Sequence, residues 1–260
     1  MHFEKIKINN MRYHGFATRD YLIMQNITLG KEKSLLEIGV GVGSTIELII
    51  GKVKEIYGID ISRELIEALK LVYQNNNCVK MQCLDVCEEN DFDKKFDVIY
   101  SADTLEHVKM ANAFFDFIAK HLFTDGVSVV TFPNESKQKH HGITWFGCRD
   151  ELLTLVDNAG LKIVELCEVK PTVWHVIIRR WLWDLPKSLV SRGNKKKLPQ
   201  TFDQTEAFQI FKNTANIKTL FFAYYAKVIT KIAVLLPLYE YRDVGEKINN
   251  KILLMRLKLK

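Results

Sequence analysis

Three glycines alternate with other residues immediately after an apolar run: Gly39, Gly41 and Gly43 follow Glu37 in the sequence LLEIGVGVGS. Glycines at such a point let the backbone turn tightly and let a ligand lie directly against it. Asp60 ends the next apolar run, 21 residues after Gly39. A carboxylate there can accept hydrogen bonds from both hydroxyls of a ribose. The spacing therefore predicts a site for a nucleoside-containing cofactor.

The same residues discriminate between cofactors. A dinucleotide fingerprint is G-x-G-x-x-G, because the helix N-terminus must face a pyrophosphate, but Ser44 stands where its third glycine would be. The carboxylate of Glu37 would repel a pyrophosphate, whereas it favours the ammonium and sulfonium groups of S-adenosylmethionine. Asp85 ends a third apolar run, where an adenine ring would reach. We therefore expect S-adenosylmethionine, and a nicotinamide-dependent oxidoreductase is the disfavoured alternative.

These residues need a sheet to position them. Between residues 33 and 167, short apolar runs alternate with helical patterns, which predicts a parallel sheet with helices on both faces. Strands are expected at 34–39, 55–60, 79–85, 96–101, 126–132 and 161–167. Helices are expected at 62–74, 111–122 and 150–158, the last with Gly160 as its C-cap. The terminal KILLMRLKLK alternates apolar and basic residues, which predicts a further strand.

Composition and charge divide the chain. Its 260 residues are 47% hydrophobic, which excludes a wholly disordered protein. Residues 1–167 carry 19 Lys+Arg against 24 Asp+Glu, while residues 168–260 carry 18 against 7, so the net charges are −5 and +11. We expect an N-terminal helical cap (1–30), a cofactor-binding core (31–169), a basic, aromatic-rich helical insertion (170–246) and a last core strand (247–260).

Several other classes of protein are disfavoured. The five cysteines include no C-x-x-C pair, which predicts reduced thiols in a cytoplasmic protein and no metal site. The most apolar stretch, 219–239, is interrupted by Lys227 and Lys231, so we expect no transmembrane span. The N-terminal MHFEKIKINN has no apolar signal core, so export is not expected.

The chain resembles the class I S-adenosylmethionine-dependent methyltransferases over about residues 30–167. Their E/D-x-G-x-G-x-G pattern matches Glu37 to Gly43, and FDVIYSADTLEHV is similar to the fourth strand and turn of the ubiquinone-pathway-like O-methyltransferases. The resemblance implies an α/β, Rossmann-like, doubly wound sheet of seven strands with an antiparallel last strand, and S-adenosylhomocysteine as product. It implies cofactor contacts from Glu37, Gly39, Val40, Gly41, Asp60, Ile61, Asp85, Val86 and Ser101.

The acceptor side is less strongly marked. His140 and His141 follow the fifth expected strand, where the family places acceptor contacts, and histidine suits a general base because its pKa lies near neutrality. A solvent-exposed loop is the alternative interpretation. Tyr13, His107 and Trp145 are the candidate substrate-binding residues. We expect O-methylation of a small molecule or of a cell-surface polysaccharide precursor, anionic or phosphorylated because the insertion is basic.

The basic insertion leaves the choice of partner open. Its charges are interleaved with Trp and aliphatic residues rather than clustered as a phosphate track, so no nucleic-acid partner is expected. Apolar residues at helical spacing over 217–235 predict an amphipathic helix. It can serve as a substrate lid, a homodimer contact or a peripheral membrane contact. A membrane-surface or lipid-acting protein is therefore the main alternative function.

Overall fold

The computed structural model describes residues 18–41, 43, 45–134, 143–184, 225, 228, 236–248 and 251–260. The strands are β1 (Ser34–Ile38), β2 (Glu55–Asp60), β3 (Val79–Cys83), β4 (Phe96–Ala102), β5 (Leu122–Asn134), β6 (Leu161–Pro171), β7 (Tyr239–Asp243) and β8 (Lys251–Leu259). The helices are α2 (Thr18–Asn26), α3 (Ile46–Ile49), α4 (Arg63–Tyr73), the 3₁₀ turn η1 (Leu105–His107), α5 (Ala111–His121), α6 (Arg149–Asn158), α7 (Val173–Ile177) and the π-helical η2 (Ile178–Asp184).

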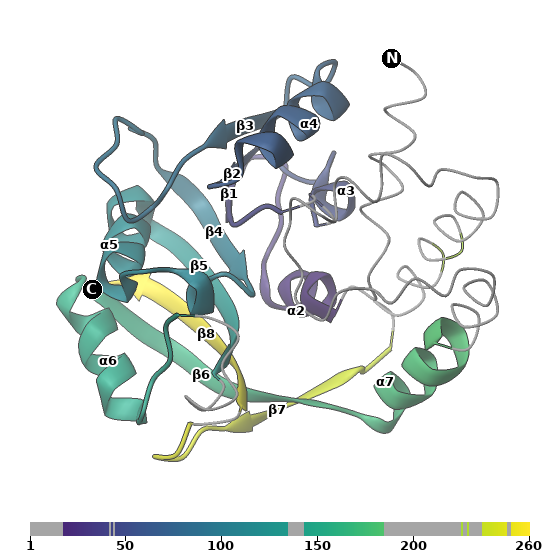
Figure 1. Cartoon of the computed structure of the whole chain (residues 1–260), viewed down its shortest axis with the longest axis vertical. Coiled ribbons are helices and arrows are strands. Elements are labelled where there is room, and N and C mark those ends of the chain that lie inside the picture. Colours follow the sequence, from purple (N-terminus) through teal and green to yellow (C-terminus); the bar gives the residue numbers. More distant parts are fainter. Residues whose placement is uncertain are drawn as a thin grey trace.

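The described strands form a single mixed sheet in the order β3-β2-β1-β4-β5-β8-β6-β7 (Figure 1). Strands β1 to β5 pair in parallel, and β8 is inserted antiparallel between β5 and β6. The expected α/β, doubly wound sheet with an antiparallel last strand is thus confirmed. Strand β7 is an eighth strand that the sequence did not predict. It pairs with the extension of β6 that ends at Pro171, beyond the expected end of that strand.

Local sequence explains the helix that follows the second strand. Ser62 caps α4, its side-chain oxygen accepting a hydrogen bond from the Leu65 backbone N–H at 3.4 Å. Leu65, Leu69 and Tyr73 recur at intervals of four and are buried, so one face of the helix packs on the sheet. Gly160 follows α6 with a φ of 74°, as expected for a helix C-cap.

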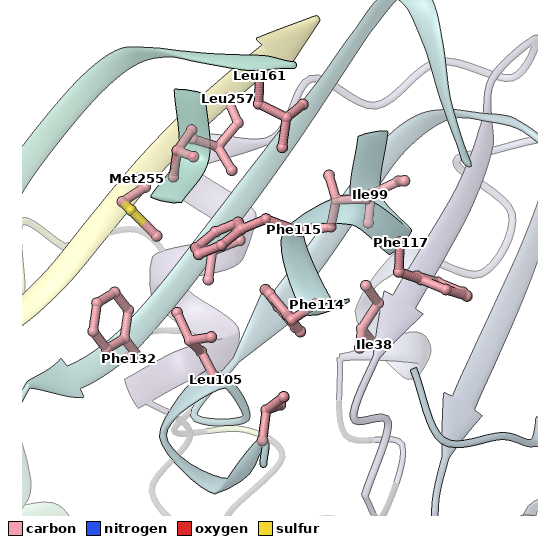
Figure 2. Packing of buried hydrophobic residues seen from close by; sticks show 14 of the residues in the cluster. Ile38, Ile99, Leu105, Phe114, Phe115, Phe117, Phe132, Leu161, Met255 and Leu257 are labelled. Atoms are coloured by element: carbon pink, nitrogen blue, oxygen red, sulfur yellow. The ribbon is translucent and has the colours of Figure 1, made fainter. Parts of the chain in front are cut away.

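The helices cover both faces of the sheet and create two cores. Helices α2, α3 and α4 pack on one face, and α5 and α6 pack on the other. Figure 2 shows part of the second core, where α5 contributes three phenylalanines that pack against side chains from β1, β4, β5, β6 and β8. This core includes Ile38, Ile99, Phe114, Phe115, Phe117, Phe132, Leu161, Met255 and Leu257. The two layers fix the central strands, so the loops at their carboxyl ends have a rigid base.

Two kinds of feature are absent from the described residues. Within these ranges, no helix is long and apolar enough to cross a membrane. Within the same ranges, no group of three or more His, Cys, Asp or Glu side chains is placed to hold a metal ion. The expected helix over 217–235 lies outside the described residues except at Tyr225 and Val228. The proposed region boundaries stay predictions.

Candidate cofactor and acceptor site

The glycine loop has the backbone conformation that its sequence predicts. Gly39, Gly41 and Gly43 have φ values of 77°, 51° and 70°, in the left-handed region that favours glycine. A Cβ atom at Gly39 would collide with Oγ1 of Thr104, because the end of β4 packs against the loop. A Cβ atom at Gly41 would meet nothing within 4 Å. Gly39 is thus required by packing, whereas Gly41 faces open space that a ligand can enter.

The buried carboxylate of Asp60 joins this loop to the end of β2. Its Oδ2 accepts a hydrogen bond from Gly41 N at 2.9 Å, and its Oδ1 accepts one from Ser62 N at 2.9 Å. Each carboxylate oxygen has a second lone pair, so both remain able to accept a ribose hydroxyl. Asp60 therefore has a role that the sequence did not reveal, which is to hold the glycine loop in place.

Glu37 places a second buried carboxylate beneath the loop. The Tyr100 hydroxyl donates to Glu37 Oε2 at 2.7 Å, and the two residues are register partners in adjacent strands β1 and β4. Such a charge-assisted hydrogen bond fixes the carboxylate in one orientation. The sequence did not single out Tyr100, because only the strand register shows that it faces Glu37.

Three further cofactor candidates follow strands β2 and β3. Ile61 directly follows Asp60 and is 71% exposed, an unusual position for isoleucine that suits packing on an adenine ring. Asp85 and Val86 are half-buried after β3, and Asp85 Oδ1 accepts a hydrogen bond from Cys87 N at 2.9 Å. Both groups lie at the carboxyl ends of β2 and β3, where the sequence predicted them.

Two candidates have side chains that serve the fold. Ser101 is fully buried, and its hydroxyl donates to the Ile38 carbonyl oxygen at 3.0 Å, which ties β4 to β1. The Val40 side chain is buried in the core. The Ser101 hydroxyl thus has a structural partner, and the expected contacts of Ser101 and Val40 with the cofactor stay predictions.

These positions fit S-adenosylmethionine. A loop of left-handed glycines offers open space, two buried carboxylates lie beside it, and an exposed apolar side chain follows. The carboxylate of Glu37 suits the cationic amino group, and that of Asp60 suits the ribose hydroxyls. The chemistry of the donor set thus agrees with the cofactor expected from the sequence.

The candidate acceptor residues Tyr13, His140 and His141 lie outside the described residues. The two ends of the histidine loop, however, are defined. Asn134 and Phe146 exchange hydrogen bonds: Asn134 Nδ2 donates to Phe146 O at 3.0 Å, and Phe146 N donates to Asn134 Oδ1 at 2.9 Å. This pair closes the base of the loop at the carboxyl end of β5.

The same loop returns beside η1. The backbone N–H groups of Ile143 and Thr144 donate to Glu106 O at 2.6 and 3.0 Å. The neighbouring His107 is exposed, and its Nε2 lies 3.7 Å from Oε1 of the buried Glu106. A buried carboxylate beside an exposed imidazole can orient the ring. The structure thus keeps His107 among the candidate acceptor contacts.

Trp145 and Phe146 differ in their burial. Trp145 is half-buried and stays a candidate for the pocket wall. Phe146 is 2% exposed and packs edge-to-face on Phe132, with ring centroids 5.6 Å apart. Phe146 is therefore a core residue.

Asp103 is a further candidate site residue, which the sequence did not single out. It is exposed directly after β4 and has a φ of 50°. Among the described residues, it is the one non-glycine residue with a positive φ. Its N–H donates to Thr131 O at 2.9 Å, which anchors the turn. A left-handed non-glycine residue costs about 1–2 kcal/mol, and such strain is concentrated at functional sites. Aspartate tolerates this conformation better than most residues, so its occurrence in the sequence is only a weak signal.

Comparisons with known proteins agree with this geometry. The family model described as a methyltransferase domain matches residues 14–166, more than half of the chain. The ubiquinone biosynthesis O-methyltransferase of Rickettsia conorii (strain ATCC VR-613 / Malish 7) is 27% identical over 107 residues, which cover 41% of this chain and 37% of that protein. The chain thus matches well under half of the length of this relative.

Solved structures share the fold at low identity. A methyltransferase candidate from Bacillus halodurans C-125 is 15% identical, with a TM-score of 0.53 over 93% of this chain and 98% of its own. The cyclase SpnF is 14% identical, with a TM-score of 0.57 over 93% of this chain and 80% of its own. At this identity the likeness shows the fold and not the reaction. The family match carries the assignment: this chain belongs to the methyltransferase-domain family of class I, and S-adenosylmethionine is its cofactor.

Proposed function

We propose that the protein transfers the methyl group of S-adenosylmethionine to a hydroxyl oxygen of a small molecule. The observation that carries this proposal is the Asp60 carboxylate, which fixes the glycine loop and keeps lone pairs for a ribose. The relative from Rickettsia conorii is named as an O-methyltransferase, which supports oxygen as the atom that is methylated.

The cofactor side of the mechanism rests on described residues. Glu37 holds the cationic amino group, Asp60 accepts the ribose hydroxyls, and Ile61 covers the adenine. Bound S-adenosylmethionine supplies a methyl carbon that its sulfonium already activates. The protein has two further tasks, which are to align the acceptor oxygen with that carbon and to remove its proton.

His140 and His141 are the proposed general bases. In the sequence they lie between Asn134, which ends β5, and Ile143, which donates a hydrogen bond to Glu106 in η1, and both of these residues lie at the edge that carries the glycine loop. Asp103 and His107 follow β4 at the same edge and are proposed to contact the acceptor. In the transfer, the acceptor O–H gives its proton to the base while the oxygen takes the methyl group, and the departing sulfur keeps the bonding electron pair.

The acceptor is proposed to be a small hydroxylated molecule or a sugar precursor of a cell-surface polysaccharide, with negative charge. The net charge of +11 over residues 168–260 supports an anionic acceptor. Nucleotide-linked sugars and hydroxylated aromatic acids are two anionic, hydroxyl-bearing classes of acceptor with which this proposal can be tested.

The test is the formation of S-adenosylhomocysteine and of a methylated product, measured by mass spectrometry with both acceptor classes. With an accepted substrate, His140→Gln or His141→Gln should lower turnover about 10²- to 10⁴-fold and leave cofactor affinity unchanged. His107→Gln is the matched control for an imidazole at the same edge, and it should mainly raise KM. If no acceptor with a hydroxyl is methylated, or if neither histidine variant slows transfer tenfold, the proposed chemistry is wrong.

A further inference from the structure

The helix formed by α7 and η2 exposes an apolar face. Val173, Ile177 and Trp181 recur at intervals of four, so they lie on one side of the helix, and they are 74%, 41% and 59% exposed. Trp174 and Val176 flank them and are also more than half exposed. An ordinary surface helix presents polar residues to solvent instead. An apolar patch of this density marks an interaction surface.

The opposite side of the helix is firmly attached to the protein. His175 and Ile178 are buried, and the His175 ring packs on the Tyr239 ring of β7 with centroids 5.0 Å apart. At the start of the helix, the Thr172 hydroxyl donates to Pro237 O at 2.6 Å. Figure 1 shows α7 at the far end of the β6–β7 ribbon, away from α5 and α6. The exposed side chains are therefore presented by an anchored helix.

The charge around this face is positive. Arg179 and Arg180 are exposed on the same helix, and the sequence contains no acidic residue between Glu168 and Asp184. Tryptophan prefers the boundary between acyl chains and headgroups, and arginine is attracted to anionic lipid phosphates. The combination is complementary to an anionic bilayer in both its apolar and its charged parts.

We propose that this face, defined by Val173, Trp174, Ile177 and Trp181 and called the α7 face, binds the surface of an anionic lipid bilayer. The helix lies in the interface, with its tryptophans among the headgroups and its two arginines on lipid phosphates. This inference goes beyond the proposed methyl transfer, which requires no membrane. Binding would bring the enzyme to acceptors that are held at a membrane surface.

The test uses the full chain and vesicles of phosphatidylcholine and phosphatidylserine in equal parts, with phosphatidylcholine vesicles for comparison. The protein should sediment with the anionic vesicles, and its tryptophan emission should shift to shorter wavelength. Trp174→Ser/Trp181→Ser should weaken binding at least about tenfold, and Arg179→Gln/Arg180→Gln about ten- to thirtyfold. Phe123→Ser removes an exposed aromatic residue from the start of β5 and should leave vesicle binding unchanged.

Affinity for S-adenosylhomocysteine serves as the check that each variant is folded. If the double tryptophan variant does not fold, Trp181→Ser alone and the emission shift of the wild-type protein decide the question. The proposal is overturned if the wild-type protein does not bind anionic vesicles at physiological salt, or if the tryptophan variants bind as tightly as the wild type. It is also overturned if sedimentation velocity shows a dimer that these variants dissociate while no vesicle binding occurs, because the face would then be a contact between two copies.

Discussion

Replacing Asp60 by Ala should weaken both the fold and cofactor binding. The substitution removes two hydrogen bonds, each 2.9 Å long, from the backbone N–H groups of Gly41 and Ser62 to a buried carboxylate. A hydrogen bond to a charged group contributes about 1.5–3 kcal/mol, and water can replace part of that near a loop. We therefore expect the free energy of unfolding to fall by about 2–4 kcal/mol, which a typical domain tolerates without unfolding.

Cofactor affinity should fall as well, because the ribose loses a charged acceptor. The same magnitude, about 1.5–3 kcal/mol, corresponds to a dissociation constant that is raised about 10- to 150-fold. Titration calorimetry with S-adenosylhomocysteine measures this effect, and denaturant unfolding without ligand measures the loss of stability.

Asp97→Ala is the matched control. Its Oδ2 accepts hydrogen bonds from both the N–H and the hydroxyl of Ser34, each at 2.7 Å, at the amino end of β1. This variant also removes two hydrogen bonds to a carboxylate, but at the opposite end of the strand from the glycine loop. It should lose stability and keep cofactor affinity. Wild-type affinity in the Asp60 variant, or an equal loss of affinity in the Asp97 variant, would refute the assignment of Asp60 to the ribose.

Three further predictions follow from the same structure. Gly39→Ala should lower the melting temperature more than Gly41→Ala, because only the Cβ atom at position 39 collides with Thr104 after β4. Both variants should bind the cofactor more weakly, which calorimetry measures. Glu37→Gln should lower cofactor affinity while Tyr100→Phe, which keeps the carboxylate, lowers it less, and equal effects would argue against a role for the charge. Burial lowers the pKa of His121, so the unfolded chain binds a proton at higher pH than the folded one, and the free energy of unfolding should fall as the pH drops below about 6.5. A pH series of melting temperatures should show this fall, and His121→Asn should reduce it.

Much of the sheet could be predicted because its signals are local. Strand β2 has the predicted bounds, because a charged residue stands at each end of its apolar run and marks where the strand begins and ends. The helix expected over 62–74 and the alternating last strand were also predicted from the sequence, and both are confirmed. The tight turn at the three glycines was also predicted from their spacing, and their positive φ angles agree with it.

The parts that could not be predicted depend on contacts between distant segments. Strand β7 is short and exposes four of its five residues, so it has almost no hydrophobic pattern and exists through its pairing with β6. Tyr100 meets Glu37 only because β1 and β4 pair in a particular register. The hydrogen bond from the Ser101 hydroxyl to Ile38 O depends on the same pairing, so the sequence did not predict it.

The most direct test of the central claim is a calorimetric titration of the wild-type protein with S-adenosylhomocysteine and, separately, with NAD. A glycine loop flanked by the carboxylates of Glu37 and Asp60 should bind S-adenosylhomocysteine with one-to-one stoichiometry, and it should not bind NAD, whose pyrophosphate those carboxylates repel. Binding of NAD with no binding of S-adenosylhomocysteine would contradict the account of this site.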